Sequence, residues 1–560
     1  MLLRVSVLLL LVSLSACTAE LDGAMGGGDE AESSFIGGGK TDLAGPGVYE
    51  AWGVLLVSNS LDRQGLDDVV RLDKRAADSI SDYRAGADGV LGSADDRFIF
   101  SLETLDGLYF VGPAAYERLR DHARRMGWES PEGMRTLLSA LLDHQGGEDG
   151  RGHFLLPKEG DLAAIPQDPD NPITPEKVAL GRLLFHDRGL AQNPVDPENI
   201  NNYSCASCHH AAGGFGSGNL QGFGEGGTGF GVHGEGRTIQ EGFDKVDAQP
   251  VKTPPALNLN WQPVVLSNGA LGAGGPNEGT DLLWKDGTPT AFNALGFEGV
   301  ETQAIAGLAA HRLIDDEHPE NTEASSLARN PEYRAMFDAA FGPDAKIDQT
   351  NVGLAIAAFE RTIMSQRAPF QRFVAGEKDA LNDVEVRGAL RFFGSAGCVS
   401  CHTGPALNSK GFHVMGFGDM DQFDPSTGFS DESLTVAANP EANLGRASFT
   451  GRDKDRFAFK VPQLYNLRDH VAFGHGVSFT SVREVVDYMN DGASSNPRLS
   501  DVRTSLLKMS MSPADCADIA AFIEDGLYDP ELHRYEPEVF PTGDCGINGD
   551  ASSLEDLGCP

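Results

Sequence analysis

The sequence predicts an all-α protein in which short helices are joined by long irregular loops. Apolar residues recur at helical spacing in the segments 66–83, 331–341 and 351–367, and further helices are predicted at 300–308 and 482–489. The chain has 68 glycines and 30 prolines among 560 residues, which indicates much irregular backbone. A pentapeptide Cys-x-x-Cys-His occurs twice. We therefore expect two helical domains, one around each pentapeptide, preceded by a smaller helical domain.

The repeated pentapeptide predicts covalently bound haem. Its copies are Cys205-Ala206-Ser207-Cys208-His209 and Cys398-Val399-Ser400-Cys401-His402. Two thiols at this spacing can form thioethers to the vinyl groups of one c-type haem, and the following histidine can bind the iron as proximal ligand. The alternatives are a redox Cys-x-x-Cys or half of a zinc site. A zinc site needs two further ligands, and only haem attachment requires histidine at both fifth positions.

The first residues predict export. Arg4 precedes the short apolar run Val5–Leu14, and Leu14-Ser15-Ala16-Cys17 resembles a bacterial lipobox with acylation at Cys17. The alternative is an ordinary signal peptide with a chance cysteine. Thr18 follows this cysteine, at a position where an aspartate would favour the inner membrane. We therefore expect residues 1–17 to direct the protein to the periplasm, with a lipid anchor in the outer membrane. The glycine-rich, acidic residues 18–48 are predicted to form a flexible tether.

Charge and cysteine content limit the partners and the redox chemistry. The net charge is −38, with a pI near 4.6. Such a surface counts against binding nucleic acid or anionic lipid through charge and favours a basic partner. Four cysteines beyond the lipobox are assigned to haem. Cys516, Cys545 and Cys559 then leave one disulfide and one odd thiol, with the pairing open, and the last two lie in a tail at 536–560.

A helical domain is predicted at 49–145. Its segment 102–119 resembles a helix-hairpin-helix module, with Gly112 in the turn and Pro113 opening the second helix. Such modules often bind DNA phosphates. The excess of acidic residues and the predicted export favour a role in packing or partner docking instead.

The order of motifs from about residue 165 to 535 resembles the bacterial di-haem cytochrome c peroxidase family, which includes MauG-type enzymes. The matching motifs are LGRLLFHDRGL (180–190), the first pentapeptide, KTPPALN (252–258), LWKDG (283–287), VETQAIAG (300–307), IAAFERTIMSQRAPFQRF (356–373), ALRFFGSAGCVSCHTGPALN (389–408), FAFKVPQLYNLRD (457–469) and VREVVDYM (482–489). The resemblance implies one cytochrome c-like domain at 165–345, with the peroxidatic haem, and another at 346–535, with the electron-transfer haem.

The resemblance also implies iron ligands. His209 and His402 would be the proximal ligands. Met489 would be the distal ligand of the second iron, where peroxidases have methionine and MauG-type enzymes tyrosine; the alternatives are Met415 as ligand and a core role for Met489. His233, in the glycine-rich loop 213–236, would cap the first iron and leave on activation, unless it is a solvated loop residue.

Further site residues follow from the same resemblance. Trp284 matches an indole between the haems, or else is a buried core tryptophan. Gln303 matches a distal glutamine, but the family's glutamate about ten residues later is missing. His311 could shuttle the proton in its place, and Arg312 could stabilise negative charge. Both could equally be structural, and Glu301 remains a candidate acid.

The resemblance implies an inter-domain calcium, but this chain lacks one of the ligands. The family's inter-domain calcium would use an asparagine where Lys252 stands. An ammonium group cannot ligate Ca²⁺, which counts against a calcium ion at this place.

The implied activity is reduction of H₂O₂ with electrons from a small basic cytochrome c or cupredoxin. Two alternatives remain open. One is a MauG-like or rubber-oxygenase-like oxidase, favoured by the missing glutamate. The other is a non-catalytic electron carrier, which would result if His233 and Met489 never leave their irons.

Overall fold

The computed structural model describes residues 48–314, 326–422 and 440–559. The predicted signal, the lipobox and nearly all of the tether lie outside these residues. Within them, no helix is both long and apolar enough to cross a membrane. Strand is confined to two small antiparallel pairs, β1 (Gly227–Thr228) with β2 (Thr238–Ile239) and β3 (Phe412–His413) with β4 (Phe459–Lys460). The predicted helical class is therefore confirmed.

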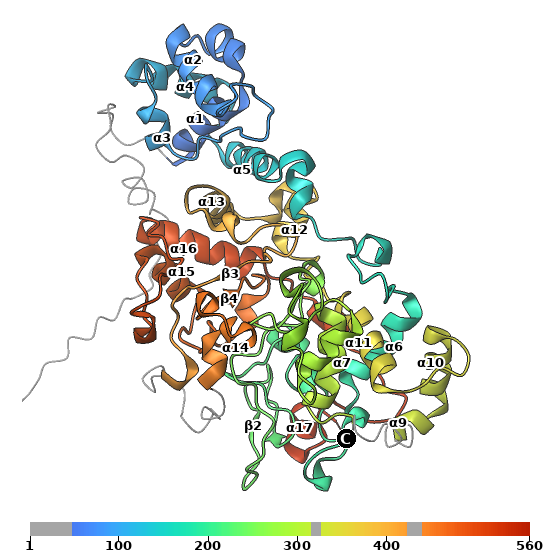
Figure 1. Cartoon of the computed structure of the whole chain (residues 1–560). Coiled ribbons are helices and arrows are strands. Elements are labelled where there is room, and N and C mark those ends of the chain that lie inside the picture. Colours follow the sequence, from blue (N-terminus) through green and yellow to red (C-terminus); the bar gives the residue numbers. More distant parts are fainter. Residues whose placement is uncertain (1–47, 315–325, 423–439, 560) are drawn as a thin grey trace, which may run out of the picture.

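An N-terminal helical unit lies at one end of the molecule, and the C-terminal helix α17 lies at the opposite end (Figure 1). The helices of this N-terminal unit are α1 (Val48–Ser60), α2 (Lys74–Arg84), α3 (Leu102–Gly107), α4 (Pro113–Arg125) and α5 (Pro131–Gln145). Helix α1 packs against α4 and α5. The unit contacts the rest of the chain through α5 and α13 (Asp383–Leu390), where Arg135 donates to Asp383 and to the Leu381 carbonyl.

The predicted continuous helix at 66–83 was wrong. A single π-turn, Gly65–Val69, is separated from α2 by Arg71, which has a left-handed φ of 64°. The Asp73 side chain accepts a hydrogen bond from the Arg75 amide and so caps α2. An N-cap offers the backbone an alternative to continuing the preceding helix. The predicted turn before α4 is confirmed, with Gly112 as N-cap and Pro113 at the first helical position.

Three helices form the core around the first pentapeptide: α6 (Pro175–His186), α7 (Gly299–Ala310) and α11 (Gln349–Glu360). Helix α11 packs on both α6 and α7, and α10 (Pro331–Phe341) packs on α6. Glycine permits these close approaches. A Cβ at Gly181 of α6 would lie 1.9 Å from the Ala355 carbonyl oxygen, and one at Gly353 would lie 2.5 Å from Ile305 Cγ1. The short helix α9 (Ser326–Arg329) precedes α10.

Around the second pentapeptide, α13 and α15 both pack on α16. The helices beyond α11 are α12 (Pro369–Val374), α13, α14 (Ala447–Thr450), α15 (Val482–Asp491), α16 (Pro513–Ala521) and α17 (Ala551–Asp556). The predicted helices at 300–308, 331–341 and 482–489 correspond to α7, α10 and α15. The prediction for 351–367 was right only as far as residue 360.

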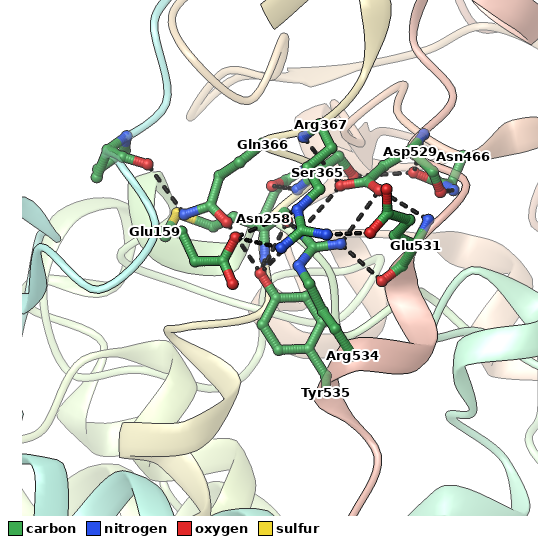
Figure 2. A network of polar contacts seen from close by, with 12 residues as sticks. Glu159, Asn258, Ser365, Gln366, Arg367, Asn466, Asp529, Glu531, Arg534 and Tyr535 are labelled. Atoms are coloured by element: carbon green, nitrogen blue, oxygen red, sulfur yellow. Dashed lines mark hydrogen bonds and ion pairs between the residues drawn. The ribbon is translucent and has the colours of Figure 1, made fainter.

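The residues after α11 leave the helix because they join the two halves of the molecule. Ser365 donates through its amide to Asn258 Oδ1 at 3.2 Å and through its hydroxyl to Asn466 Oδ1 at 2.9 Å. Nearby, the Asp529 carboxylate accepts hydrogen bonds from the backbone amide of Arg367 and from the guanidinium group of Arg534 (Figure 2). These tertiary hydrogen bonds satisfy backbone and side-chain groups that a longer helix would have bonded internally.

Candidate functional site: two haem attachment segments

Both pentapeptides have the same local structure. Each forms a short 3₁₀ turn, Cys205–Ser207 or Cys398–Ser400. In each, the histidine amide donates to the carbonyl of the first cysteine, at 3.0 Å for His209 and 2.9 Å for His402. The segments agree although they are almost two hundred residues apart in the sequence.

Each histidine ring is oriented by a backbone carbonyl a few residues further along the chain. The Nδ1 atom of His209 lies 3.1 Å from Phe215 O, and that of His402 lies 3.0 Å from Leu407 O. Phe215 and Leu407 both have left-handed φ angles, 57° and 46°, which turn these carbonyls toward the rings. An Nδ1–H that donates to a carbonyl leaves Nε2 free to bind a metal. Burial lowers the pKa of His209 to about 4 and also lowers that of His402, so both rings are neutral at pH 7, as metal binding requires.

The cysteines fit haem attachment better than the two alternatives. None of the four is in a disulfide. Burial raises the pKa of Cys208 and of Cys398 to about 12, the opposite of the stabilised thiolate that a redox Cys-x-x-Cys needs. Across the ranges 48–314, 326–422 and 440–559, no three His, Cys, Asp or Glu side chains gather as a zinc site would require. The residues present therefore fit two c-type haems.

The glycine-rich loop that follows the first segment packs tightly on it. A Cβ at Gly222 would lie 3.0 Å from Cys208 Sγ, and one at Gly218 would lie 1.6 Å from the His233 carbonyl oxygen. His210, next to the proximal histidine, bonds this same carbonyl through Nε2 at 3.0 Å. Only glycine can occupy these contact positions without a backbone shift.

His233, the predicted mobile cap, has an exposed side chain in this structure. Its loop is fastened by its backbone, because the Glu235 carboxylate accepts from the amides of Val232 and His233. A role for His233 as iron ligand stays a prediction.

The C-terminal tail forms hydrogen bonds with both the first attachment segment and the glycine-rich loop. Cys545 and Cys559 form a disulfide, which resolves the pairing that the sequence left open, and Cys516 is free and buried. Asn548 Oδ1 accepts from the hydroxyl of Ser207, between the two attachment cysteines, at 2.5 Å.

Two aspartates of the tail bind the loop directly. Asp550 accepts from the Gly229 amide at 2.9 Å, and Asp556 accepts from the amides of Phe230 and Gly231 at 2.9 and 2.7 Å. We call residues 545–559 the cystine loop.

Gln303 and His311 lie on one stripe of α7. A Cβ at Gly307 would lie 3.4 Å from Gln303 Nε2 and 3.8 Å from His311 Cδ2, so both side chains converge on this glycine. Trp284 is half-buried and donates through Nε1 to Thr280 Oγ1 at 3.2 Å. The roles predicted for Gln303 and Trp284 stay predictions.

The acids missing from the end of α7 are supplied by the glycine-rich region. His311 Nδ1 lies 2.9 Å from Asp247 Oδ2, and Arg312 Nε lies 2.8 Å from Glu225 Oε2. Sequence reasoning missed both partners because neither lies near α7 in the chain.

Glu301, by contrast, is fully occupied. It forms a two-pronged, fully buried ion pair with Arg361, at 2.6 and 2.7 Å. This arrangement favours a structural role for Glu301.

Lys252 holds the loop through neutral oxygen atoms. Its ammonium donates to the carbonyls of Ser217 and Asn219 at 3.1 and 2.6 Å, and burial lowers its pKa to about 7. These carbonyls are thus already bonded to Lys252. The expectation that Lys252 counts against calcium at this place stays a prediction.

The second attachment segment lies against an aromatic cluster. The Phe392 ring centroid is 6.4 Å from that of His402, and Phe392 packs on Phe393 and Phe522. Met489 lies one and two turns after the buried Val486 and Val482, on the same face of α15, and is half-buried.

The side chain of Tyr488, the residue before Met489, is fixed by hydrogen bonds. Its hydroxyl donates to the carbonyls of Met415 and Gly416, both at 2.8 Å. Neither Met489 nor Met415 is thereby established as a ligand.

The fold and the two segments define a di-haem c-type cytochrome. The sequence model of the di-haem cytochrome c peroxidase family matches residues 175–379. The chain is 29% identical over 363 residues to the methylamine utilization protein MauG of Methylorubrum extorquens, covering 64% of this chain and 81% of that protein. It is 26% identical to the cytochrome-c peroxidase IdrP1 of Denitromonas iodatirespirans, covering 68% and 90%. It is 27% identical to the cytochrome c551 peroxidase of Nitrosomonas europaea, covering 63% and 84%. Residues 175–379 thus match the di-haem cytochrome c peroxidase family, and about two thirds of the chain is similar to MauG and peroxidase members of that family.

Proposed function

We propose that this chain is a di-haem c-type peroxidase that reduces H₂O₂ to water with electrons from a small redox protein. The observation that carries the proposal is the pair of attachment segments, each with a neutral histidine whose Nε2 is free for iron. The two segments share this ligand geometry but differ in what surrounds them, as a peroxide site and an electron-entry site should.

Haem iron supplies one-electron transfer and a binding position for peroxide. The chain's own residues prepare the two sites for different tasks. The thiols of Cys205 and Cys208, and of Cys398 and Cys401, would hold one haem each, with His209 and His402 beneath the irons. Around the first site, Gln303, His311 and Arg312 supply polar groups that can bind peroxide and move its protons. Around the second site, aromatic side chains pack beside His402, and a Met489 thioether would raise the reduction potential. Trp284 is the proposed stepping stone between them.

The same proposal includes a domain layout and a location. Residues 165–345 and 346–535 would be the two cytochrome c-like domains, and 49–145 a docking or packing domain. Residues 1–17 would be a lipoprotein signal, with Cys17 acylated and the protein held at the periplasmic face of the outer membrane. The acidic surface would favour a basic cytochrome c or cupredoxin as donor.

A MauG-like oxidase is the second candidate. Residues 310–313 contain no acid where the family's glutamate is expected, and one similar protein is itself named MauG. The Tyr488 hydroxyl, however, is bound by two backbone carbonyls, and this favours Met489 over a tyrosine as ligand. A non-catalytic carrier is the third candidate.

Peroxide turnover after half-reduction separates these candidates. Purified holoprotein, half-reduced or fully oxidised, is mixed with a reduced small c-type cytochrome and H₂O₂, and donor oxidation is followed. Fast turnover only after half-reduction supports a peroxidase gated by His233, and equal turnover from both forms supports an ungated one. Absence of turnover from both forms rejects the peroxidase and moves attention to an organic substrate or to electron carriage.

A further inference from the structure

We propose that His311 and Asp247 form the proton-handling pair of the first haem site, in which His311 exchanges a proton with peroxide and Asp247 is its positioning residue. The inference rests on the proposed peroxidase function and names the group that would perform its acid–base step. It assigns a role to Asp247, which no motif in the sequence indicates.

Asp247 is held rigidly and orients the imidazole. Its carboxylate accepts from His311 Nδ1 at 2.9 Å, and its side chain is 13% exposed, against 34% for His311. Its backbone bonds Glu225 O through N–H, at 2.9 Å, and the Gly224 amide through C=O, at 2.8 Å. A Cβ at Gly224 would lie 2.4 Å from Asp247 Oδ2, so glycine is needed for the carboxylate to lie there. Because Nδ1 is engaged, Nε2 of His311 is the nitrogen left to meet a substrate.

The pair lies beside the first attachment segment. Gly222, two residues before Gly224, packs on Cys208, and a Cβ there would lie 3.0 Å from Sγ. On α7, the side chains of Gln303 and His311 converge on Gly307, which has no side chain to separate them. Buried residues such as Val300 and Leu308 occupy other faces of the same helix. The stripe therefore offers an amide and an imidazole around one open position.

The charges facing His311 favour its protonated form. Asp247 raises the pKa of His311, while burial and the neighbouring Arg312 oppose this. Arg312 is itself paired with Glu225, and the remaining titratable group close enough to interact is His209. The carboxylate thus keeps the imidazole able both to accept and to return a proton.

The overall step is H₂O₂ + 2 e⁻ + 2 H⁺ → 2 H₂O. The O–O bond breaks, and the donor protein supplies both electrons. His311 Nε2 takes the proton from the inner oxygen and gives it to the departing oxygen, which leaves as water. The two further protons come from solvent, and Asp247 stays ionised throughout.

The test is the pH profile of the wild-type holoprotein and three variants. We would measure kcat/KM for H₂O₂ across about pH 5 to 9 for Asp247→Asn, His311→Gln and the control Asp419→Asn. Asp419 is a more deeply buried carboxylate that likewise pairs with a histidine, 2.9 Å from His475 Nε2, in the part of the chain beyond the second segment. Haem content and the optical spectrum are recorded for each variant to confirm that both haems are bound.

In the wild type, kcat/KM should rise with pH as His311 loses its proton. Asp247→Asn should move this rise to lower pH and lower the plateau about tenfold or more. His311→Gln should remove the rise and cost roughly a hundredfold. Asp419→Asn should leave the position of the rise unchanged. A wild-type profile in Asp247→Asn overturns the proposal.

A measurement that does not depend on activity tests the pair itself. The folded pKa of His311 is raised, so its contribution to stability is present below its unfolded pKa, about 6.5, and is lost as pH rises through the folded pKa. Asp247→Asn should therefore lower the Tm of the holoprotein more at low pH than at high pH. A pH-independent loss of Tm rejects the ion pair. Wild-type protein that never turns over peroxide rejects the proposed function instead, while this stability measurement still reports on the pair.

Discussion

The two attachment segments share one backbone arrangement but have different surroundings. In both, a 3₁₀ turn holds the cysteines, and a carbonyl of a residue with left-handed φ orients the histidine. Later in each half, a lysine precedes a proline-containing stretch that ends at an asparagine with φ of 56°, Asn258 or Asn466. Both asparagines bond Ser365 at the junction. The agreement extends well beyond the pentapeptide itself.

The environments divide the labour. The first segment is bound by the cystine loop, and the glycine-rich region that packs on it forms two His/Arg–carboxylate pairs. The second is backed by phenylalanines. The N-terminal unit reaches it through Gln145, which bonds the Phe393 carbonyl, and His153, in the segment after that unit, lies beside Thr403. A site that moves protons needs the first environment, and a site that only passes electrons is served by the second. The comparison indicates that the surroundings, rather than the backbone arrangement of the attachment segments, would set the role proposed for each haem.

The largest expected effect comes from exchanging the proximal ligands. His209→Ala should abolish peroxide turnover, because the iron of the peroxide site loses its ligand. His402→Ala should instead block oxidation of the donor protein while peroxide still perturbs the first haem's optical spectrum. Stopped-flow spectroscopy of both variants checks this, and the reverse assignment of the two effects would break the comparison.

Removing one partner of a buried ion pair should cost about 3–5 kcal/mol of unfolding free energy in either half. Glu301→Gln removes the buried carboxylate that binds Arg361 in the first half and leaves it only Glu298, and Asp515→Asn removes the carboxylate that binds Arg391 in the second. Denaturant unfolding measures both losses. If Glu301 is structural, the pH profile of peroxide turnover keeps its position, and a displaced profile at unchanged stability would instead make Glu301 the catalytic acid.

Opening the cystine loop should loosen only the first site. The double substitution Cys545→Ser with Cys559→Ser removes a disulfide that closes a sequence separation of 14 residues. We expect a loss of about 3 kcal/mol and faster amide hydrogen exchange at Gly229, Phe230 and Gly231, which the tail carboxylates bind. Exchange around His402 is the internal control. Equal acceleration at both segments would show that the tail stabilises the whole chain rather than one site.

The second haem should respond to Met489. Met489→His should lower its reduction potential, since a thioether raises the potential relative to an imidazole. Redox titration would show this as a shift in one haem only, and Met415→His serves as the matched variant. An unchanged potential removes Met489 as the ligand.

The smallest effect should be the salt dependence of the donor reaction. With a net charge of −38, association with a basic donor should weaken as ionic strength rises. The second-order rate constant for donor oxidation, measured at several salt concentrations, checks this. A flat dependence rejects electrostatic steering.

Sequence patterns predicted what depends on local residues. The cysteines and histidines, the turn at Gly112 and Pro113, and the helices α7, α10 and α15 all follow from short-range spacing and capping. The helix expected at 66–83 was interrupted by the Asp73 cap, and the one expected to reach residue 367 stopped where Ser365 and its neighbours join the two halves. Tertiary hydrogen bonds decide such boundaries.

The partners of His311 and Arg312 could not be predicted for a related reason. Asp247 and Glu225 come from a loop more than sixty residues earlier, and acidic residues are so common in this chain that none stands out. The pairing of Cys545 with Cys559 was likewise one of three choices that spacing alone does not separate. A weak indication was present in both cases, because each group lies in a glycine-rich or irregular stretch that has to pack on another part of the chain.

The grip of the cystine loop on Ser207 bears on the order in which the protein matures. Asn548 binds the residue between Cys205 and Cys208, so docking of the tail covers the peptide on which haem attachment takes place. Haem should therefore be attached to the first segment before the tail docks, and a closed Cys545–Cys559 bond would mark a chain whose first site is complete. We expect chains made without haem to accumulate with these two thiols open, which thiol alkylation and mass spectrometry would reveal.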